Sequence, residues 1–382
     1  MNELPGFPWW RRDATLIAIL TALAIFALAI AFLYSRSYKV RQQALAEKWF
    51  HRGDTSLSSG QPAEAVRDFR TALGYSPDNP EYLLRLAQAL AAEPAQSDQA
   101  IAYFLNLWEQ KPGDGLYNLE LARLFARKEQ VRPATQYYTA AISGAWADDP
   151  AGHRRRARLE YIQFLLQHNS LTLAQAEAIT LAAGVPASDI NARFVAADTL
   201  LQVSEYERAM AEYLSLVGND RARATAGAGN AAFQLGRFRT ASKYLDMAID
   251  AGNKDQRLAT KLNQAKQIVN VDPTERGTGS AERARRAADA YNVAGARLQQ
   301  CSTTSNQPLE AATPSTELQQ LFAQWKEEGR TIPRSLRESD SRDRIMDLVF
   351  RIENTTARLC GTPTGQDWPL WMLGRYGDRV QQ

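Results

Sequence analysis

The chain has 382 residues, of which 45% are hydrophobic and 23% are charged, and these fractions exclude a chain that is disordered throughout. Its formal net charge of +3 is too small for a dedicated nucleic-acid binder, so no nucleic-acid partner is expected. Its three histidines and two cysteines lack zinc-ligand spacing, so we expect no metal and no cofactor.

The first element is an uncharged segment, residues 14–35, which follows an N-terminal tail of residues 1–13. As a helix its 22 residues would span about 33 Å, enough to cross a bilayer. Trp9 and Trp10 precede it and Tyr34 lies at its end, and such rings favour the headgroup level. The alternative is a cleaved signal peptide, but its apolar core is shorter, about 7–15 residues, and ends in small residues. We therefore expect one transmembrane anchor in contact with the lipid bilayer.

Residues 36–45 contain neither proline nor glycine. We expect them to form a helical linker, within one long helix that leaves the membrane and enters the next element. Such a helix would hold the rest of the chain close to the bilayer.

Between residues 46 and 252 a pattern of small and aromatic residues recurs. In its first copy, Gly53 lets a second helix approach closely, Ala65 is the small residue that meets it, and the turn falls near Gly60. The alanines at the position of Ala65 in successive copies are Ala65, Ala100, Ala134, Ala209 and Ala241. They are separated by 35, 34, 75 and 32 residues, and the interval of 75 contains one further copy whose pattern is poorly kept.

A period near 34 residues with small residues at these offsets resembles the tetratricopeptide repeat (TPR) family. The resemblance implies an all-α fold in which about six helical pairs stack into a curved solenoid with a concave face, here over residues 46–270. The amphipathic segment Arg257–Asn270 suits the capping helix that such an array needs.

The resemblance also implies which positions face the concave groove. In the first helix of each pair, they are the residue directly after the aromatic residue of the pattern and the residue directly after its small residue. Here they are Phe50, Asp54, Leu84, Gln88, Leu119, Arg123, Phe194, Asp198, Ala226 and Asn230. Their mixture of apolar and polar groups suits an extended or helical peptide, so other proteins or peptides are the expected partners. Some family members clamp a terminal carboxylate with Lys and Asn, and Phe50 and Asp54 at those positions do not favour this. The alternative is that several of these side chains pack between repeats.

The C-terminal third begins after a linker at residues 271–280, which is rich in Pro, Gly, Ser and Thr. Residues 281–382 then form a small helical module with three predicted helices, at 281–301, 316–329 and 339–360. In its tail, Trp368, Trp371 and Met372 are expected to cover the core of this module, with a partner-docking patch as the alternative.

An up-down-up arrangement of these helices would place Cys301 beside Cys360, and a disulfide would need Cα atoms within about 7 Å. A disulfide favours an oxidising compartment outside the cytoplasm. The positive-inside rule favours the opposite topology, because basic residues are more numerous after the apolar segment than before it. We expect the soluble part outside, because both cysteines fall at matching helix ends, and the anchor in a bacterial inner membrane.

The sequence contains none of the common nucleotide-binding, hydrolase or metalloprotease motifs, so we expect no enzyme. The basic run at residues 152–160, "GHRRRARLE", is interpreted as a solvated helix face, with contact to anionic lipid or RNA as the alternative. The leading hypothesis is a membrane-anchored scaffold that binds partner proteins in its concave groove near the bilayer, in envelope biogenesis or secretion. The alternative is a structural subunit of a larger envelope complex that docks through residues 281–382.

Overall fold

The computed structural model is built of helices, and it describes residues 9–330, 336 and 338–380, with the side chains of residues 16–330, 336 and 338–376. It divides into two compact units, Met1–His168 and Asn169–Gln382. Residues 1–8 of the predicted tail, and the side chains of Trp9 and Trp10, lie outside the described part of the chain.

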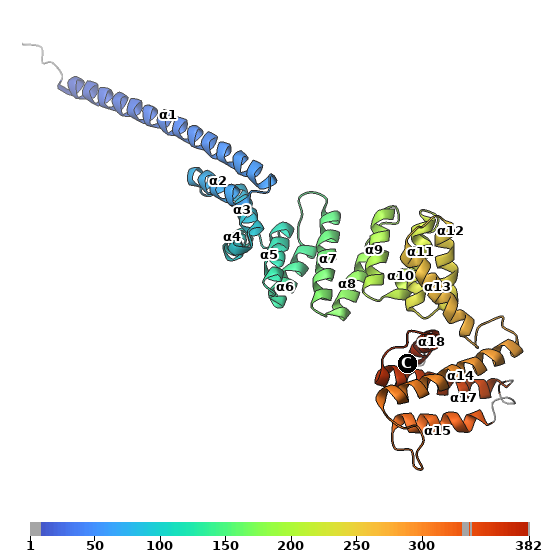
Figure 1. Cartoon of the computed structure of the whole chain (residues 1–382). Helices are drawn as coiled ribbons and strands as arrows, with labels where there is room; N and C mark the ends of the chain where they lie inside the picture. Colours follow the sequence, from blue (N-terminus) through green and yellow to red (C-terminus); the bar gives the residue numbers. More distant parts are fainter. Residues whose placement is uncertain (1–8, 331–335, 337, 381–382) are drawn as a thin grey trace, which may run out of the picture. The chain divides into compact units, whose positions relative to one another are not determined.

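The first unit begins with a single helix of 50 residues, α1 (Trp9–Ser58), drawn as the long blue helix of Figure 1. The apolar segment and the first helix of the first repeat are therefore parts of one continuous helix in the structure. Within the described residues, the part of α1 from Leu16 onward is the one helix that is long and apolar enough to cross a membrane, by length and composition. The helix ends before Gly60, which turns the chain with a φ of +73°.

The rest of the first unit consists of helices that pair in antiparallel order along the chain. They are α2 (Pro62–Tyr75), α3 (Pro80–Ala92), α4 (Ser97–Gln110), α5 (Gly115–Arg127), α6 (Val131–Ser143) and α7 (Pro150–Gln167). The close approach expected at Gly53 is present, since a Cβ atom there would lie 2.7 Å from the ring of Phe69. Ala65 and Phe69 are fully buried. A 3-10 turn, η1 (Pro94–Gln96), connects α3 and α4.

The second unit begins with α8 (Leu171–Ala183) and continues with two further pairs. These are α9 (Ile190–Gln202) with α10 (Tyr206–Ser215), and α11 (Arg221–Gln234) with α12 (Phe238–Asp250). A final helix, α13 (Gln256–Val271), packs on α12 through Leu258, Leu262 and Ala265 and corresponds to the predicted capping helix.

The three helices predicted for the C-terminal module are present as α14 (Ser280–Ser305), α15 (Glu317–Gly329) and α17 (Ser339–Cys360). Their core is formed by buried Tyr291, Leu298 and Val349 with their neighbours. Cys301 and Cys360 are joined by a disulfide, with Cα atoms 5.6 Å apart.

A fourth helix of the module, α18 (Trp368–Val380), was not expected from the sequence. Leu370 joins the core of the module, whereas Met372 is buried among residues of α11, α12 and α13. Trp368 and Trp371 are half-buried on the same side as Met372. The prediction that the two tryptophans and Met372 cover the core of the module is therefore wrong: they cover the end of the solenoid.

The packing around α18 also shows what the predicted linker, residues 271–280, connects. The ring of Tyr376 contacts that of Phe238 edge-on at 5.3 Å, and a Cβ atom on Gly236 would lie 2.8 Å from Tyr376. The segment 271–280 is thus a loop between α13 and α14, and within the described residues α18 covers the end of the solenoid by packing on α13 as well as on α17.

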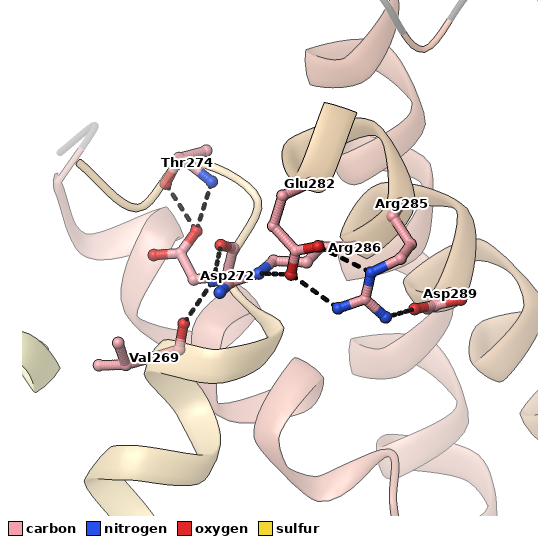
Figure 2. A network of polar contacts seen from close by, with 7 residues as sticks. All are labelled: Val269, Asp272, Thr274, Glu282, Arg285, Arg286 and Asp289. Atoms are coloured by element: carbon pink, nitrogen blue, oxygen red, sulfur yellow. Dashed lines mark hydrogen bonds and ion pairs between the residues drawn. The ribbon is translucent and has the colours of Figure 1, made fainter. Parts of the chain in front are cut away.

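A polar network fixes this loop against the start of α14 (Figure 2). The Nη1 atom of Arg286 donates to the carbonyl oxygens of Val269 and Asp272, at 2.9 Å each, and so caps the C-terminal end of α13. Glu282 accepts from Arg285 and from Arg286 at 3.0 Å. Hydrogen bonds from Arg285 and Arg286 lower the pKa of Glu282 to about 2.

Candidate partner-binding groove

The first unit contains a hollow of about 610 Å³ on the face formed by the first helices of successive pairs. It is lined by the last turn of α1, by α3 and α5, and by one residue of α6. The lining residues are Leu57, Gln88, Ala91, Ala92, Glu120, Arg123, Ala126, Arg127 and Tyr138. We call this hollow the first-unit groove.

Small apolar side chains form part of the lining of the groove. Ala91 and Ala92 end α3, Ala126 lies near the end of α5, and Leu57 closes the side formed by α1. Because alanines project little beyond the backbone, a larger side chain of a ligand has room to approach these helices.

The charged side chains of the groove are largely paired with one another. Arg123 donates from Nε and Nη2 to both oxygens of Glu160, at 2.8 and 2.7 Å, and from Nη1 to Glu120 at 2.8 Å. The contact with Glu160 is bidentate, and together with the bond to Glu120 it engages all three nitrogens of the guanidinium. Since Arg123 is already committed to two carboxylates, it is poorly placed to clamp a third one from a ligand.

Burial perturbs the titration of the groups around Arg123. Removal from water raises the pKa of Glu120, although Arg123 counteracts this effect. Hydrogen bonds from Arg123 to Glu160 raise the pKa of the guanidinium further. Burial, together with the charge of Glu160, raises the pKa of Tyr138 to about 12. The phenol therefore stays protonated at neutral pH.

Of the residues predicted for the first unit, Gln88 and Arg123 line the groove. Asp54 is half-buried and pairs with Arg85 at 3.3 Å, while Leu84 is half-buried against the core. Phe50 and Leu119 are buried, so the prediction that they face a ligand is wrong. Phe50 instead stacks on Tyr82 of the following repeat, with ring centroids 4.6 Å apart.

The predicted residues of the second unit are engaged within that unit. Phe194 and Ala226 are buried, so they offer no surface to a ligand. Asp198 accepts hydrogen bonds from the hydroxyl of Tyr213 and, at 2.8 Å, from Arg223. Asn230 accepts from Lys261 Nζ at 2.7 Å, and burial lowers the pKa of this lysine.

The prediction missed several residues of the groove. Glu120 and Arg127 lie three residues before and four residues after Arg123, which is the spacing of one helix face, and this signal was present in the sequence. Tyr138 lies on α6, and its contacts with Tyr161 and Phe164 of α7 become visible only in the folded unit.

A family model described as tetratricopeptide repeat matches residues 56–124, a segment that contains most of the residues lining the groove. This matched segment is a TPR repeat region. The helical pairs with small residues at their contacts extend the repeat beyond the matched segment, as at Gly227, where a Cβ atom would lie 2.3 Å from Tyr213. TPR arrays are scaffolds for protein–protein interaction, and the groove lies on the face that such arrays use.

Solved structures of TPR proteins are similar to this chain at low identity. YrrB, described as a TPR protein with an unusual peptide-binding site, is 18% identical, with 51% of this chain and 97% of that chain covered and a TM-score of 0.38. PilF of Pseudomonas aeruginosa is 15% identical, with 59% and 98% covered and a TM-score of 0.38. The TPR2AB domain of yeast Sti1 in complex with pHSP90 is 16% identical, with 74% and 99% covered and a TM-score of 0.30. No curated protein matches the sequence.

Proposed function

We propose that this protein is a membrane-anchored TPR scaffold that binds segments of partner proteins in the first-unit groove and holds them near the bilayer. The observation that carries this proposal is that α1 contains the apolar segment and also supplies Leu57 to the groove. An anchored groove of this kind suits assembly of other proteins at a membrane, as in envelope biogenesis or secretion. The chemistry of the groove supports peptide binding and suggests no reaction.

We further propose that the anchor lies in a bacterial inner membrane and that the soluble part lies outside the cytoplasm. The disulfide between Cys301 and Cys360 supports this topology, because such bonds persist in oxidising compartments. In cells with a permeabilised outer membrane, a maleimide that cannot cross the inner membrane should label the two cysteines only after reduction. Labelling that requires permeabilisation of the inner membrane but no reductant would place the soluble part in the cytoplasm.

The groove is tested by photo-crosslinking of the full chain in its native membrane. A benzoylphenylalanine at Ala92, an exposed alanine of the groove, should crosslink to a partner, whereas the same replacement at Ala63, an exposed alanine of α2, should not. Ala126→Trp should fill the groove and abolish the crosslink at position 92. Equal crosslinking at both positions would contradict the proposal.

A second candidate function is that of a structural subunit that docks through the C-terminal module. One observation favours it: a hollow of about 600 Å³ lies between α15 and α17 and is lined by Glu327, Glu328, Arg344 and Arg351, among others. A charge reversal, Arg351→Glu, should then remove partners that survive Ala126→Trp. If Ala126→Trp removes every partner, the scaffold function alone remains.

A further inference from the structure

The apolar segment and the groove are two parts of one uninterrupted helix. From residue 14 to residue 52 the sequence of α1 contains no proline and no glycine, the residues at which helices usually kink. Tyr38 and Val40, between the apolar segment and the first repeat, are 55% and 59% exposed. Within the described part of the chain, no neighbouring helix therefore supports this stretch, and α1 determines how the groove is held relative to the membrane.

The length of this stretch sets the height of the groove. Twenty-two residues separate Ser35, the end of the apolar segment, from Leu57 in the groove, and at 1.5 Å per residue they span about 33 Å. Each residue also turns the helix by about 100°, so the same stretch fixes the direction in which the groove opens. An upright α1 thus holds the groove at one height and one orientation above the bilayer.

A rigid support of this kind benefits one class of partner. A soluble protein can reach a groove at any height, so a flexible tether would serve it equally well. A partner in the same bilayer reaches the groove only where its own segment lies at the matching height. When the heights match, the shared membrane raises the effective concentration of the two sites.

The groove also restricts the chemistry of the bound segment. Leu57, Ala91 and Ala126 offer an apolar surface with room for a larger side chain. Arg123 is committed to Glu120 and Glu160, whereas Arg127 is exposed at the rim, and within the described residues no ion pair is recorded for it. A segment with a bulky apolar side chain and a nearby acidic residue would complement both features.

We propose that the first-unit groove receives an apolar and acidic segment of a protein anchored in the same bilayer, presented about 33 Å above the hydrocarbon boundary. This inference rests on the proposed membrane anchoring and adds the class of partner. It requires that α1 acts as a rigid support and that the partner is membrane-bound, and each requirement is testable by itself.

The rigid support is tested on the full chain in lipid nanodiscs with an energy acceptor on the headgroups. A donor is attached to Ala92→Cys without reductant, so that the disulfide-bonded cysteines do not react. Seven helix-forming residues inserted after Gln43 should raise the donor by about 10 Å and reduce energy transfer, whereas two residues should raise it by only about 3 Å. Equal energy transfer in all three proteins would show that α1 bends, and would overturn the inference.

The partner class is tested with the photo-crosslinker at position 92 in native membranes. Insertion of seven residues restores the direction of the groove to within about 20° but changes its height, and insertion of two residues turns it by about 200°. Both insertions should reduce crosslinking about tenfold or more, and the crosslinked partner should stay in the membrane after alkaline extraction. Arg127→Glu should reduce crosslinking severalfold, whereas Arg132→Glu, a matched reversal of an exposed arginine on α6, should not.

The outcomes separate this inference from the proposed function. If the wild-type protein gives no crosslink at position 92, the proposed scaffold function fails. If the crosslink persists unchanged in both insertions, or if alkaline extraction releases the partner, the scaffold function stands and the inference of a membrane-bound partner is wrong.

Discussion

This protein contains two clusters that each consist of one arginine and two carboxyl groups. The clusters differ in whether their carboxyl groups receive hydrogen bonds. In the first-unit groove, Arg123 donates three hydrogen bonds to Glu120 and Glu160, and its side chain is 39% exposed. In the second unit, Arg297 lies 3.5 Å from Asp367 and donates to the carbonyl oxygen of Gly361 at 2.5 Å.

The second cluster contains a carboxyl group that receives no hydrogen bond. Glu353 of α17 is fully buried, and neither of its side-chain oxygens has a partner within the described part of the structure. Burial, followed by the charge of Asp367, raises the pKa of Glu353 to about 8 despite the opposing effect of Arg297. The comparison shows that the carboxyl groups of the groove have hydrogen-bond donors, whereas Glu353 is buried without a donor and avoids a buried charge by keeping its proton.

The largest expected effect comes from removal of the arginine in the buried cluster. Arg297→Leu should destabilise the module by about 3–5 kcal/mol, because it leaves Asp367 and Glu353 without a cation and the carbonyl of Gly361 without its donor. Hydrogen exchange of α17 and α18 in the full chain measures this loss. Adding Glu353→Leu to the variant should restore part of the stability, and a double variant as unstable as the single one would contradict this account.

The next effect is a dependence of stability on pH. Between the ordinary pKa of 4.5 and about 8, the unfolded chain releases the proton of Glu353 while the folded chain keeps it. The free energy of unfolding of the module therefore falls as pH rises through this range, by at most about 5 kcal/mol. Above pH 8, Glu353 causes no further loss. Glu353→Gln should remove this slope and stabilise the module at pH 8. An unchanged slope in the variant would assign it to another group.

The smallest effect is expected in the groove. Arg123→Gln should cost about 1 kcal/mol, because the side chain is 39% exposed and water can solvate Glu120 and Glu160 in its place. Hydrogen exchange of α5 and α7 provides the measurement, and Arg132→Gln on α6 serves as the control, with an effect within about 0.5 kcal/mol. If Arg123→Gln lost as much unfolding free energy as Arg297→Leu, solvent exposure would not explain the difference between the two clusters.

The helical pairs could be predicted because their signal is local and repeated. Small residues such as Gly53 and Ala65 fall at fixed offsets, and the space they leave is filled by Phe69, which belongs to the same repeat. The positions facing the groove were less predictable. The offset of Phe50 predicts a position in the groove, but in the structure this ring is buried and packs on Tyr82 of the next repeat.

The last helix could not be predicted, because its sequence resembles a loop. Trp368–Val380 contains proline and glycine, which usually interrupt helices. Pro369 is tolerated because it lies in the first turn, where the missing N–H has no intrahelical partner. Gly374 is needed because a Cβ atom would lie 3.0 Å from Phe350 of α17. These reasons depend on tertiary contacts, as does the burial of Glu353.

The contact between Tyr376 and Phe238 has a consequence for how the protein is made. The two residues are separated by 138 positions, so at about 5–20 residues per second the ribosome adds Tyr376 roughly 7–28 s after Phe238. During that interval the apolar side of α12 and α13 lacks its cover and is available to chaperones. The solenoid is thus completed by a helix that is translated long after the repeats themselves. A nascent chain that stalls before residue 368 leaves the apolar side of α12 and α13 exposed.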